Sequence, residues 1–268
     1  MKPVRLGAVA YLNARPLVYG LEIRTDLFAL RFDVPSKCAA LLHEGSIDLG
    51  MIPSIEYLRG QPYRIVPDCA IISEGAVASV ALFSKTPVEA VISIAADTSS
   101  RTSTGLLRVL CCERFGIDPR FEPMHPDPVV MLRHCDAALL IGDPALFLDY
   151  EGMGLVKTDL GEQWTAMTGL PFVWAFWAGR PEALSTGHVA ALQEARDGGV
   201  AASDEVADAY CGPQHAALGR AYLRENIRYR LGEREEAGLR RFYELAARHG
   251  VVDRAQAPAF YPRPKHVY

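Results

Sequence analysis

The sequence predicts an α/β protein with two lobes, and three observations support this prediction. Short apolar segments alternate with helical patterns over the first two-thirds of the 268 residues. The resulting β-α-β-α order is typical of a largely parallel sheet, whose loops gather at the carboxyl ends of the strands. After Pro181 the chain is helical. A chain of this kind builds one lobe, crosses to a second and then returns to the first.

Composition excludes several classes of protein. Hydrophobic residues make up 50% of the chain, charged residues 22%, and the formal net charge is −4. These values are ordinary for a globular protein and unlike those of a disordered one. No basic stripe indicates a nucleic-acid partner. The apolar segment 6–12 is short for a secretory signal, and no segment approaches the roughly 18 apolar residues of a membrane span. We expect a cytoplasmic protein with neither a nucleic-acid partner nor a membrane insertion.

The cysteines and histidines lack the spacing of metal ligands. None of the six cysteines forms a Cys-x-x-Cys pair, and the adjacent Cys111 and Cys112 cannot chelate zinc as a zinc ribbon does. Most of the cysteines have apolar neighbours, and in such places Cys usually acts as a small buried hydrophobic residue. We expect reduced core thiols, no disulfide and no metal.

Four strands are predicted in the first part of the chain. Apolar or alternating segments predict strands over 4–10, 28–34, 47–52 and 77–83. Pro35 and Ser36 open a helix that ends near Gly45, and a short helix follows Pro53 and Ser54.

The middle of the chain predicts a second set of strands and helices. Strands are expected over 91–95, 137–141 and 171–178, and a helix with an apolar stripe follows residues 97–105. In the last part, apolar residues recur at the i, i+3, i+4, i+7 spacing of a helix with one buried face. The sequence contains no internal repeat and no low-complexity linker.

The lobes are predicted to divide the chain at two crossings, near 83–84 and 177–178. Residues 1–83 and 178–268 then form the first lobe, with a helical C-terminal part, and residues 84–177 form the second. This is the arrangement of the periplasmic-binding-protein type II fold, in which the ligand lies in the cleft between the lobes. The predicted fold class is therefore α/β with an inter-lobe cleft.

The strongest chemical signal is a segment rich in hydroxyl groups, Thr98-Ser99-Ser100-Arg101-Thr102-Ser103-Thr104-Gly105. It lies between a predicted strand and a predicted helix, and a helix start offers unpaired N–H groups and a partial positive charge. Arg101 can hold a carboxylate through two hydrogen bonds. Plain N-capping needs only one of these side chains, so the segment predicts an anion site. It is not a phosphate P-loop, because the glycines and the lysine are missing.

Three further segments contain candidate ligand-binding residues. Asn13 follows the first strand, where an α/β sheet places its ligand loops, although an Asn also suits a turn. Asp143 follows the strand 137–141 and can bind a substrate hydroxyl or cap the next helix, with Pro144 at its first position. On the aromatic strand 171–177 most side chains suit core packing, and one of them can stack on a planar ring.

Five motifs, taken together, resemble a known family. They are Val9-Ala10-Tyr11-Leu12-Asn13-Ala14-Arg15-Pro16-Leu17, Asp48-Leu49-Gly50-Met51-Ile52-Pro53-Ser54-Ile55-Glu56-Tyr57, Ser100-Arg101-Thr102-Ser103, Ile141-Gly142-Asp143-Pro144-Ala145-Leu146 and Asn226-Ile227-Arg228-Tyr229-Arg230-Leu231-Gly232. The family that they resemble is the chorismate dehydratase of the futalosine route to menaquinone, and the resemblance runs over nearly the whole chain.

The resemblance implies a carbon–oxygen lyase with a fold of the binding-protein type. In this family, chorismate loses water and its ring becomes aromatic, which gives 3-[(1-carboxyvinyl)oxy]benzoate without a cofactor. By the resemblance, Asn13 is the catalytic residue nearest the chemistry. The residues expected to bind this small anionic substrate are Tyr11, Ser54, Ser79, Ser100, Arg101, Thr102, Ser103, Asp143 and Trp174.

Three other functions share this fold, because fold alone does not decide function. A non-enzymatic solute-binding protein for small anions would carry an export signal, and a ligand-sensing regulator would carry a DNA-binding segment; neither is expected here. The related dihydroxynaphthoate synthase has a Ser-Pro-Cys-Pro-Asn-Asp type of loop where this chain has residues 11–16, which favours the dehydratase. The sequence leaves open whether the chain forms a homodimer.

Overall fold

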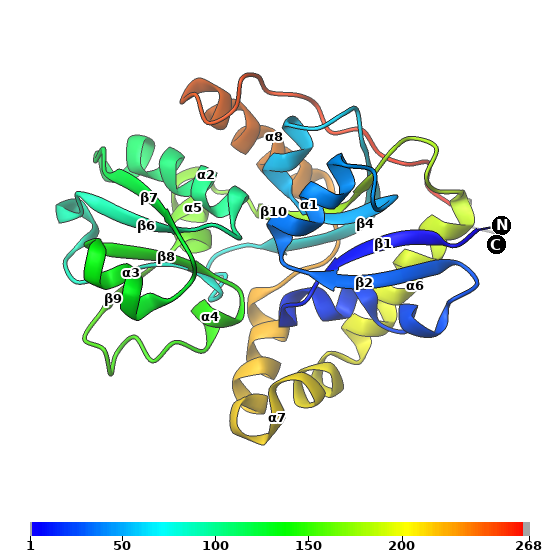
Figure 1. Ribbon diagram of the computed structural model, residues 1–268, viewed down its shortest axis with the longest axis horizontal. Coiled ribbons are helices and arrows are strands. Elements are labelled where there is room, and N and C mark those ends of the chain that lie inside the picture. Colours follow the sequence, from blue (N-terminus) through cyan, green and yellow to red (C-terminus); the bar gives the residue numbers. More distant parts are fainter. Residues whose placement is uncertain (1, 265–268) are drawn as a thin grey trace.

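The computed structural model describes residues 2–264, which form two lobes, each with its own five-stranded sheet (Figure 1). The first sheet contains β1 (Val4–Val9), β2 (Phe28–Asp33), β3 (Leu49–Pro53), β4 (Arg64–Ser73) and β10 (Phe172–Gly179). The second contains β5 (Val80–Ser84), β6 (Ser93–Asp97), β7 (Arg120–Met124), β8 (Ala137–Ile141) and β9 (Val156–Asp159). The predicted α/β class with two lobes is confirmed.

The two sheets have the same strand arrangement. Their orders are β2-β1-β3-β10-β4 and β7-β6-β8-β5-β9, so β1 corresponds to β6, β3 to β8 and β10 to β5. In each sheet the fourth strand is antiparallel to both of its neighbours, and the other strands run in one direction. The sequence contains no detectable repeat, yet the structure repeats one sheet topology. The loops after β1 and β6 therefore occupy equivalent positions in the two lobes.

Sheet membership corrects both predicted boundaries. β5 belongs to the second sheet although residues 77–83 were expected to end the first lobe, and β10 belongs to the first sheet although 171–177 was expected to end the second. The chain leaves the first sheet over residues 74–79 and returns after residue 168. A buried strand has the same apolar pattern in either sheet, so the pattern predicts the strand but not the sheet that it joins.

The structure contains three strands that the sequence analysis did not predict, namely β4, β7 and β9. β4 contains Pro67 and a positive φ at Asp68, and its pairing with β10 has two register shifts. Proline inside a strand argues against a central position, and β4 is indeed the last strand of its sheet order. β7 and β9 lie at the two ends of the second sheet, and their alternation of buried and exposed residues is weak.

Helices of the first lobe surround its sheet and extend under the junction with the second lobe. Short helical turns follow β1 and β3, and the long helices of the C-terminal part pack against η1, β4 and β10. In Figure 1, α7 projects below the two lobes. The elements are η1 (Leu12–Val18), η2 (Leu21–Ile23), α1 (Pro35–His43), η3 (Ser54–Leu58), α6 (Thr186–Ala201), α7 (Ser203–Ala221), the π-helical turn η6 (Tyr222–Asn226) and α8 (Glu233–Arg248).

Helices of the second lobe lie against β5, β6, β8 and β9. Helix α2 also contacts η3 and α8 of the first lobe, and it therefore faces across the junction. The elements are η4 (Val88–Ala90), α2 (Arg101–Leu110), the π-helical turn η5 (Cys111–Phe115), α3 (Pro128–His134), α4 (Asp143–Leu146) and α5 (Leu160–Thr168). Within residues 2–264, none of the helices combines the length and the apolar character that a membrane span requires.

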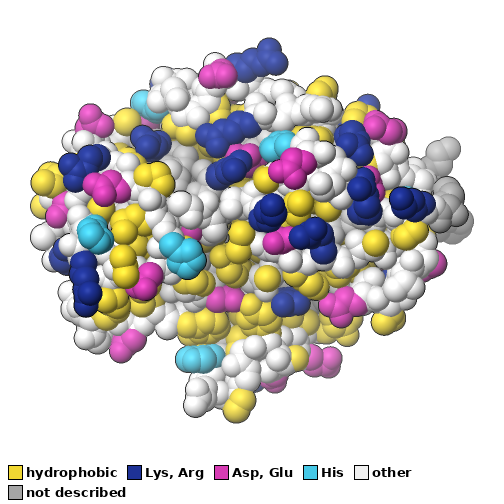
Figure 2. Space-filling model, viewed as in Figure 1, with side chains coloured by type: hydrophobic (Ala, Val, Ile, Leu, Met, Phe, Trp, Pro, Cys, Tyr) yellow, Lys and Arg dark blue, Asp and Glu magenta, His cyan; other side chains and the backbone are white. Residues whose placement is uncertain are grey.

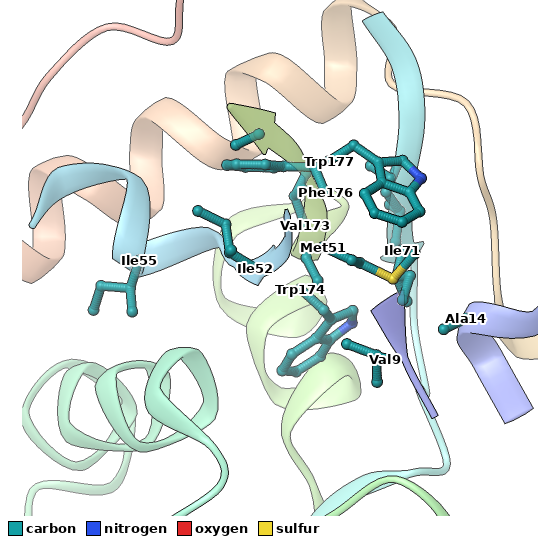
Figure 3. Packing of buried hydrophobic residues seen from close by; sticks show 14 of the residues in the cluster. Val9, Ala14, Met51, Ile52, Ile55, Ile71, Val173, Trp174, Phe176 and Trp177 are labelled. Atoms are coloured by element: carbon teal, nitrogen blue, oxygen red, sulfur yellow. The ribbon is translucent and has the colours of Figure 1, made fainter. Parts of the chain in front are cut away.

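The main apolar core spans both lobes, because side chains of α2 and α5 belong to the same buried cluster as the strands of the first sheet. Figure 3 shows the part of this core around β10, where Trp174 lies near the start of the strand and points away from Trp177. Both indoles are at most 7% exposed. The lobes are thus packed against each other rather than held only by the two crossing segments.

Candidate active site

A cavity lies between the lobes, and its empty volume, counted out to open solvent, is about 510 Å³. The loops after β1 and β6, the carboxyl ends of β3 and β8, and the starts of β5 and β10 all contribute to it. Its lining is Val9, Tyr11, Asn13, Pro35, Pro53, Ile71, Val77, Val80, Ser100, Arg101, Thr102, Ser103, Ile141, Gly142, Trp174 and Ala175. Seven of the ten sequence-predicted site residues are in this lining.

The start of α2 supplies most of the polar groups of the cavity. Ser100 is the N-cap residue, yet its side chain makes no capping hydrogen bond, so the first N–H groups of α2 lack a side-chain acceptor. Ser100 and Ser103 are at most 5% exposed and line the cavity. Simple N-capping therefore does not account for the hydroxyl-rich segment, and the arrangement provides hydrogen-bond donors for an anion.

Thr102 also joins the two lobes. Its Oγ1 accepts a hydrogen bond from the backbone N–H of Ile55 over 3.2 Å, and the hydroxyl of Ser54 lies 3.5 Å away. Ser54 itself is fully buried and is not in the lining of the cavity. Thr102 thus contributes to the contact between η3 and α2 and also lines the cavity.

Arg101 lines the cavity but already has a carboxylate partner. Its Nη1 donates to Oε2 of Glu56 over 2.7 Å, and the same carboxylate contacts His43 and Arg59. Burial alone would raise the pKa of Glu56, but the hydrogen bond with His43 and the charges of Arg101 and Arg59 lower that pKa to about 2. Arg101 therefore connects the lobes through Glu56, in addition to any contact with a ligand.

Asn13 reaches the cavity from the first turn after β1. Later in the sequence, the hydroxyl of Tyr222 lies 2.6 Å from Oγ of Ser79. Ser79 was expected to contact substrate, but it is not in the lining of the cavity, and its hydroxyl has that of Tyr222 as a partner. No local sequence pattern indicated Tyr222, which is 143 positions from Ser79 in the chain.

Tyr11 closes the cavity against the second lobe. Its ring packs on Gly142, where a Cβ atom would lie 2.6 Å from the ring, and Gly142 has a φ of +61°. A side chain at position 142 would be both strained and in collision with Tyr11. Burial raises the pKa of Tyr11, a hydrogen bond with Ser99 lowers it in part, and the charges of Asp97 and Asp143 raise it further, so the hydroxyl is neutral at neutral pH.

Trp174 provides the aromatic wall of the cavity. Its Nε1 donates to Oγ of Ser73 over 3.0 Å, and the centroid of its ring lies 4.3 Å from the ring centroid of Phe172. The other aromatic side chains of β10, those of Phe172, Phe176 and Trp177, are fully buried in the core. One aromatic residue of this strand thus faces the cavity while the others pack, and a fixed indole can stack on a planar ring.

Asp143 does not line the cavity, contrary to the expectation of direct substrate contact. It is the first residue of α4, with Gly142 as the N-cap, so it does not cap this helix either. Its carboxylate accepts hydrogen bonds from the backbone of Leu12 and the hydroxyl of Tyr210. Both carboxylate oxygens thus have partners, one in η1 and one in α7. No local sequence pattern could have indicated these partners, because both are distant in the chain.

The lining of the cavity contains no Asp, Glu, His, Lys or Cys. Tyr11 and Arg101 are its only titratable side chains among the described residues. All six cysteines are free thiols, and no group of three potential metal-ligating side chains occurs within residues 2–264. Figure 2 shows Lys and Arg side chains gathered over the middle of one face, between α2 and α1.

The two lobes, with a cavity between them, have the fold of the periplasmic binding proteins. Solved structures with this fold include a protein of Archaeoglobus fulgidus (TM-score 0.77, 18% identity, 94% of this chain and 99% of that chain). They also include the periplasmic aliphatic sulphonate-binding protein SsuA of Escherichia coli (TM-score 0.62, 15% identity, 95% of each chain).

Comparison of sequences identifies the family. The family model described as menaquinone biosynthesis matches residues 4–248, and the chain belongs to this family. A curated relative from Thermus thermophilus, named chorismate dehydratase, is 34% identical over 286 aligned positions that cover 98% of this chain and 100% of the relative.

Proposed function

We propose that this protein is a chorismate dehydratase, a cytoplasmic carbon–oxygen lyase that converts chorismate to 3-[(1-carboxyvinyl)oxy]benzoate and water. The observation that carries the proposal is the juxtaposition of Asn13 with the uncapped, hydroxyl-rich start of α2 across one cavity. It occurs in a chain whose curated relative bears the name of this activity. Chorismate is a dianion with a planar diene, and the cavity offers donors for a carboxylate and an indole for a ring.

The reaction removes a proton from the ring carbon that bears the enolpyruvyl ether and hydroxide from the neighbouring carbon. Electrons of the broken C–H bond form the new ring double bond, the C–O bond electrons leave with the hydroxide, and the proton and hydroxide together make water. Negative charge that develops on the ring can spread through the diene into the ring carboxylate. Donors fixed at the start of α2 stabilise this charge without rearrangement, as an oxyanion hole does.

The proton acceptor in this proposal belongs to the substrate. The cavity lining has no carboxylate, imidazole or amine, and the amide of Asn13 is a poor base. The side-chain carboxylate of chorismate is close to the departing proton by covalent connection. We assign to the protein the task of holding this carboxylate in line with the C–H bond, which is catalysis by positioning.

An assay with chorismate tests the proposal. Purified protein is incubated with chorismate, and the benzoate product is followed by mass spectrometry, with heat-denatured protein as the control for spontaneous decomposition. We expect enzyme-dependent appearance of 3-[(1-carboxyvinyl)oxy]benzoate. Tight binding of chorismate without turnover would overturn the proposal and support a solute-binding role. Turnover only with the substrate of the dihydroxynaphthoate synthase step would overturn it in favour of that enzyme.

A further inference from the structure

We propose that Ser73 is a positioning residue that, together with a bulge in β10, fixes the indole of Trp174 so that the cavity selects ligands with a flat ring. Ser73 is fully buried and is not in the lining of the cavity, so it acts on a ligand only through Trp174. The choice of a flat ring rests on the proposed function, because dehydration turns a ring with two tetrahedral carbons into a planar benzoate.

The backbone of β10 contains one extra residue at Trp174. Against β4, Val173 pairs with Ile72 and Ala175 pairs with Ile71. Trp174 therefore has no partner in this register, and a bulge of this kind re-aims a side chain. Neighbouring side chains of a regular strand point to opposite faces, yet Trp174 and Ala175 both line the cavity. The bulge thus brings two consecutive residues of β10 to the cavity.

The bulge also accounts for which aromatic side chain of β10 leaves the core. In a regular strand, Phe172, Trp174 and Phe176 would share one face. Phe172 and Phe176 are at most 1% exposed and are not in the lining, whereas Trp174 lines the cavity. In Figure 3 the indole of Trp174 points away from Trp177. The residue that the bulge leaves unpaired is thus the one that faces the cavity.

A hydrogen bond fixes the rotation of this indole. Its Nε1 donates over 3.0 Å to Oγ of Ser73, the last residue of β4. The hydroxyl has little room to move, because a Cβ atom added to Gly161 of α5 would lie 2.8 Å from Oγ of Ser73. The ring of Phe172 packs on the indole at an angle of 58°. Strand β4 of the first lobe and helix α5 of the second thus hold the acceptor in place.

Burial alone does not require this hydrogen bond. Trp177 is fully buried, and its Nε1 has no hydrogen-bond partner in the described part of the chain. Trp164 donates instead to the backbone carbonyl of Pro171 over 3.2 Å. Because the fold tolerates an unpartnered indole N–H in the core, we assign the contact between Trp174 and Ser73 to orientation at the cavity.

A fixed indole discriminates between ligands by the shape of their rings. Aromatic rings prefer offset-stacked or edge-to-face contact, and a flat ring can lie along the indole. A ring with tetrahedral carbons brings fewer atoms to the optimal separation and gains less dispersion energy. In the proposed reaction the ring becomes flat as water leaves. An indole held in place by Ser73 therefore stabilises the product-like ring more than the ring of chorismate.

The first test uses two probes, benzoate and cyclohexanecarboxylate, which share a carboxylate and differ in ring shape. Titrations followed by nuclear magnetic resonance should show that native protein binds benzoate roughly threefold to tenfold more tightly, which is the worth of one aromatic contact. Ser73→Ala should reduce this preference to less than twofold. Equal affinities or undetectable binding in native protein, or an unchanged preference in Ser73→Ala, would overturn the inference.

A matched control for the loss of a buried serine hydroxyl is Ser84→Ala. Ser84 is fully buried at the end of β5, is not in the lining of the cavity, and donates to the backbone carbonyl of Thr86. Ser84→Ala should keep the native preference for benzoate. An equal loss of preference in both variants would show that Ser73 has only a structural role, and would overturn the inference. Thermal unfolding and a native-like circular dichroism spectrum establish that each variant is folded.

A spectroscopic measurement tests the hydrogen bond itself. The chain has three tryptophans, and the indole N–H resonance of Trp174 is the one lost in Trp174→Phe. Ser73→Ala should shift this resonance upfield in ligand-free protein and leave those of Trp164 and Trp177 in place. Ser84→Ala should leave all three in place. An unshifted Trp174 resonance in Ser73→Ala would overturn the inference even if the enzyme is active.

Steady-state kinetics with chorismate show whether Ser73 acts through Trp174. Ser73→Ala should lower kcat roughly threefold to tenfold and leave KM within a few-fold, because the flat ring forms only as the reaction proceeds. In a Trp174→Phe background, Ser73→Ala should cause no further loss, and multiplied losses would overturn the assignment. If native protein fails to convert chorismate, the proposed function fails, while the two probes and the indole resonance still test this inference.

Discussion

The carboxylate of Asp143 accepts a hydrogen bond over 3.2 Å from the backbone N–H of Leu12, and so links the start of α4 to the start of η1 across the junction of the lobes. Its other oxygen accepts a hydrogen bond from the hydroxyl of Tyr210 in α7. Leu12 lies between Tyr11 and Asn13, both of which line the cavity. The contact therefore holds the loop after β1 against the second lobe.

Loss of the Tyr210 hydroxyl is expected to loosen this closure. Tyr210→Phe removes one charge-assisted hydrogen bond across the junction, so we expect kcat/KM to fall by roughly tenfold. Small-angle scattering of ligand-free protein should show a larger radius of gyration than that of the native protein. Tyr19→Phe, at an exposed tyrosine of the same lobe, serves as the control. Native kcat/KM and an unchanged radius for Tyr210→Phe would show that the contact does not control closure.

Asn13 is predicted to act mainly in the transition state. Asn13→Ala removes the amide and keeps the charge balance, so kcat should fall strongly while substrate affinity stays within a few-fold. Asn13→Asp is nearly isosteric but places a negative charge beside a dianionic substrate, so it should lower kcat and weaken binding as well. Steady-state kinetics and calorimetric titration separate the two effects. If Asn13→Ala retains near-native kcat, Asn13 is only a turn residue.

The start of α2 offers a test that separates anion binding from lobe contact. Ser103 lines the cavity, and no hydrogen bond from its hydroxyl to the described residues is found, so Ser103→Ala should raise KM by roughly tenfold. Thr102 also accepts a hydrogen bond from Ile55, so Thr102→Ala should raise KM and in addition lower the melting temperature. A native KM in both variants would exclude this helix start as the carboxylate site.

Glu56 makes the stability of the protein depend on acid pH. Its pKa is lowered from about 4.5 in an unfolded chain to about 2, so its contribution is complete above pH 4.5 and is lost as the pH falls toward 2. The carboxylate is buried, and the shift corresponds to roughly 3 kcal/mol. Urea unfolding at pH 7 and pH 3 should show that native protein loses about 2 kcal/mol of this contribution, because pH 3 is still above the folded pKa, and that Glu56→Gln does not.

A matched control for this experiment is Glu89→Gln, at an exposed glutamate of η4. Its stability should follow that of the native protein at both values of pH. Equal pH dependence in native protein and Glu56→Gln would contradict the assignment of this acid sensitivity to Glu56.

The sequence predicted the positions of most strands because their apolar segments are short, buried and bounded by turn residues. The strand 137–141 and the strand that begins at Val4 lie where the pattern placed them, within one residue. It also placed Asn13 and residues 100–103 just after strands, and the structure brings both to one cavity. These positions follow from the rule that loops at the carboxyl ends of strands gather at one edge of a sheet.

The tertiary structure alone decided which sheet each strand joins and which polar side chains reach the cavity. Ser54, Ser79 and Asp143 have the same chemistry as the lining residues, yet each is occupied by a partner distant in sequence, namely Thr102, Tyr222 and Tyr210. Periodicity and spacing indicate the secondary structure and the face of the helix or strand on which a residue lies, and both are local properties. The partner of a buried hydroxyl or carboxylate depends on segments up to about 140 residues away, and only packing of the two lobes brings these segments together.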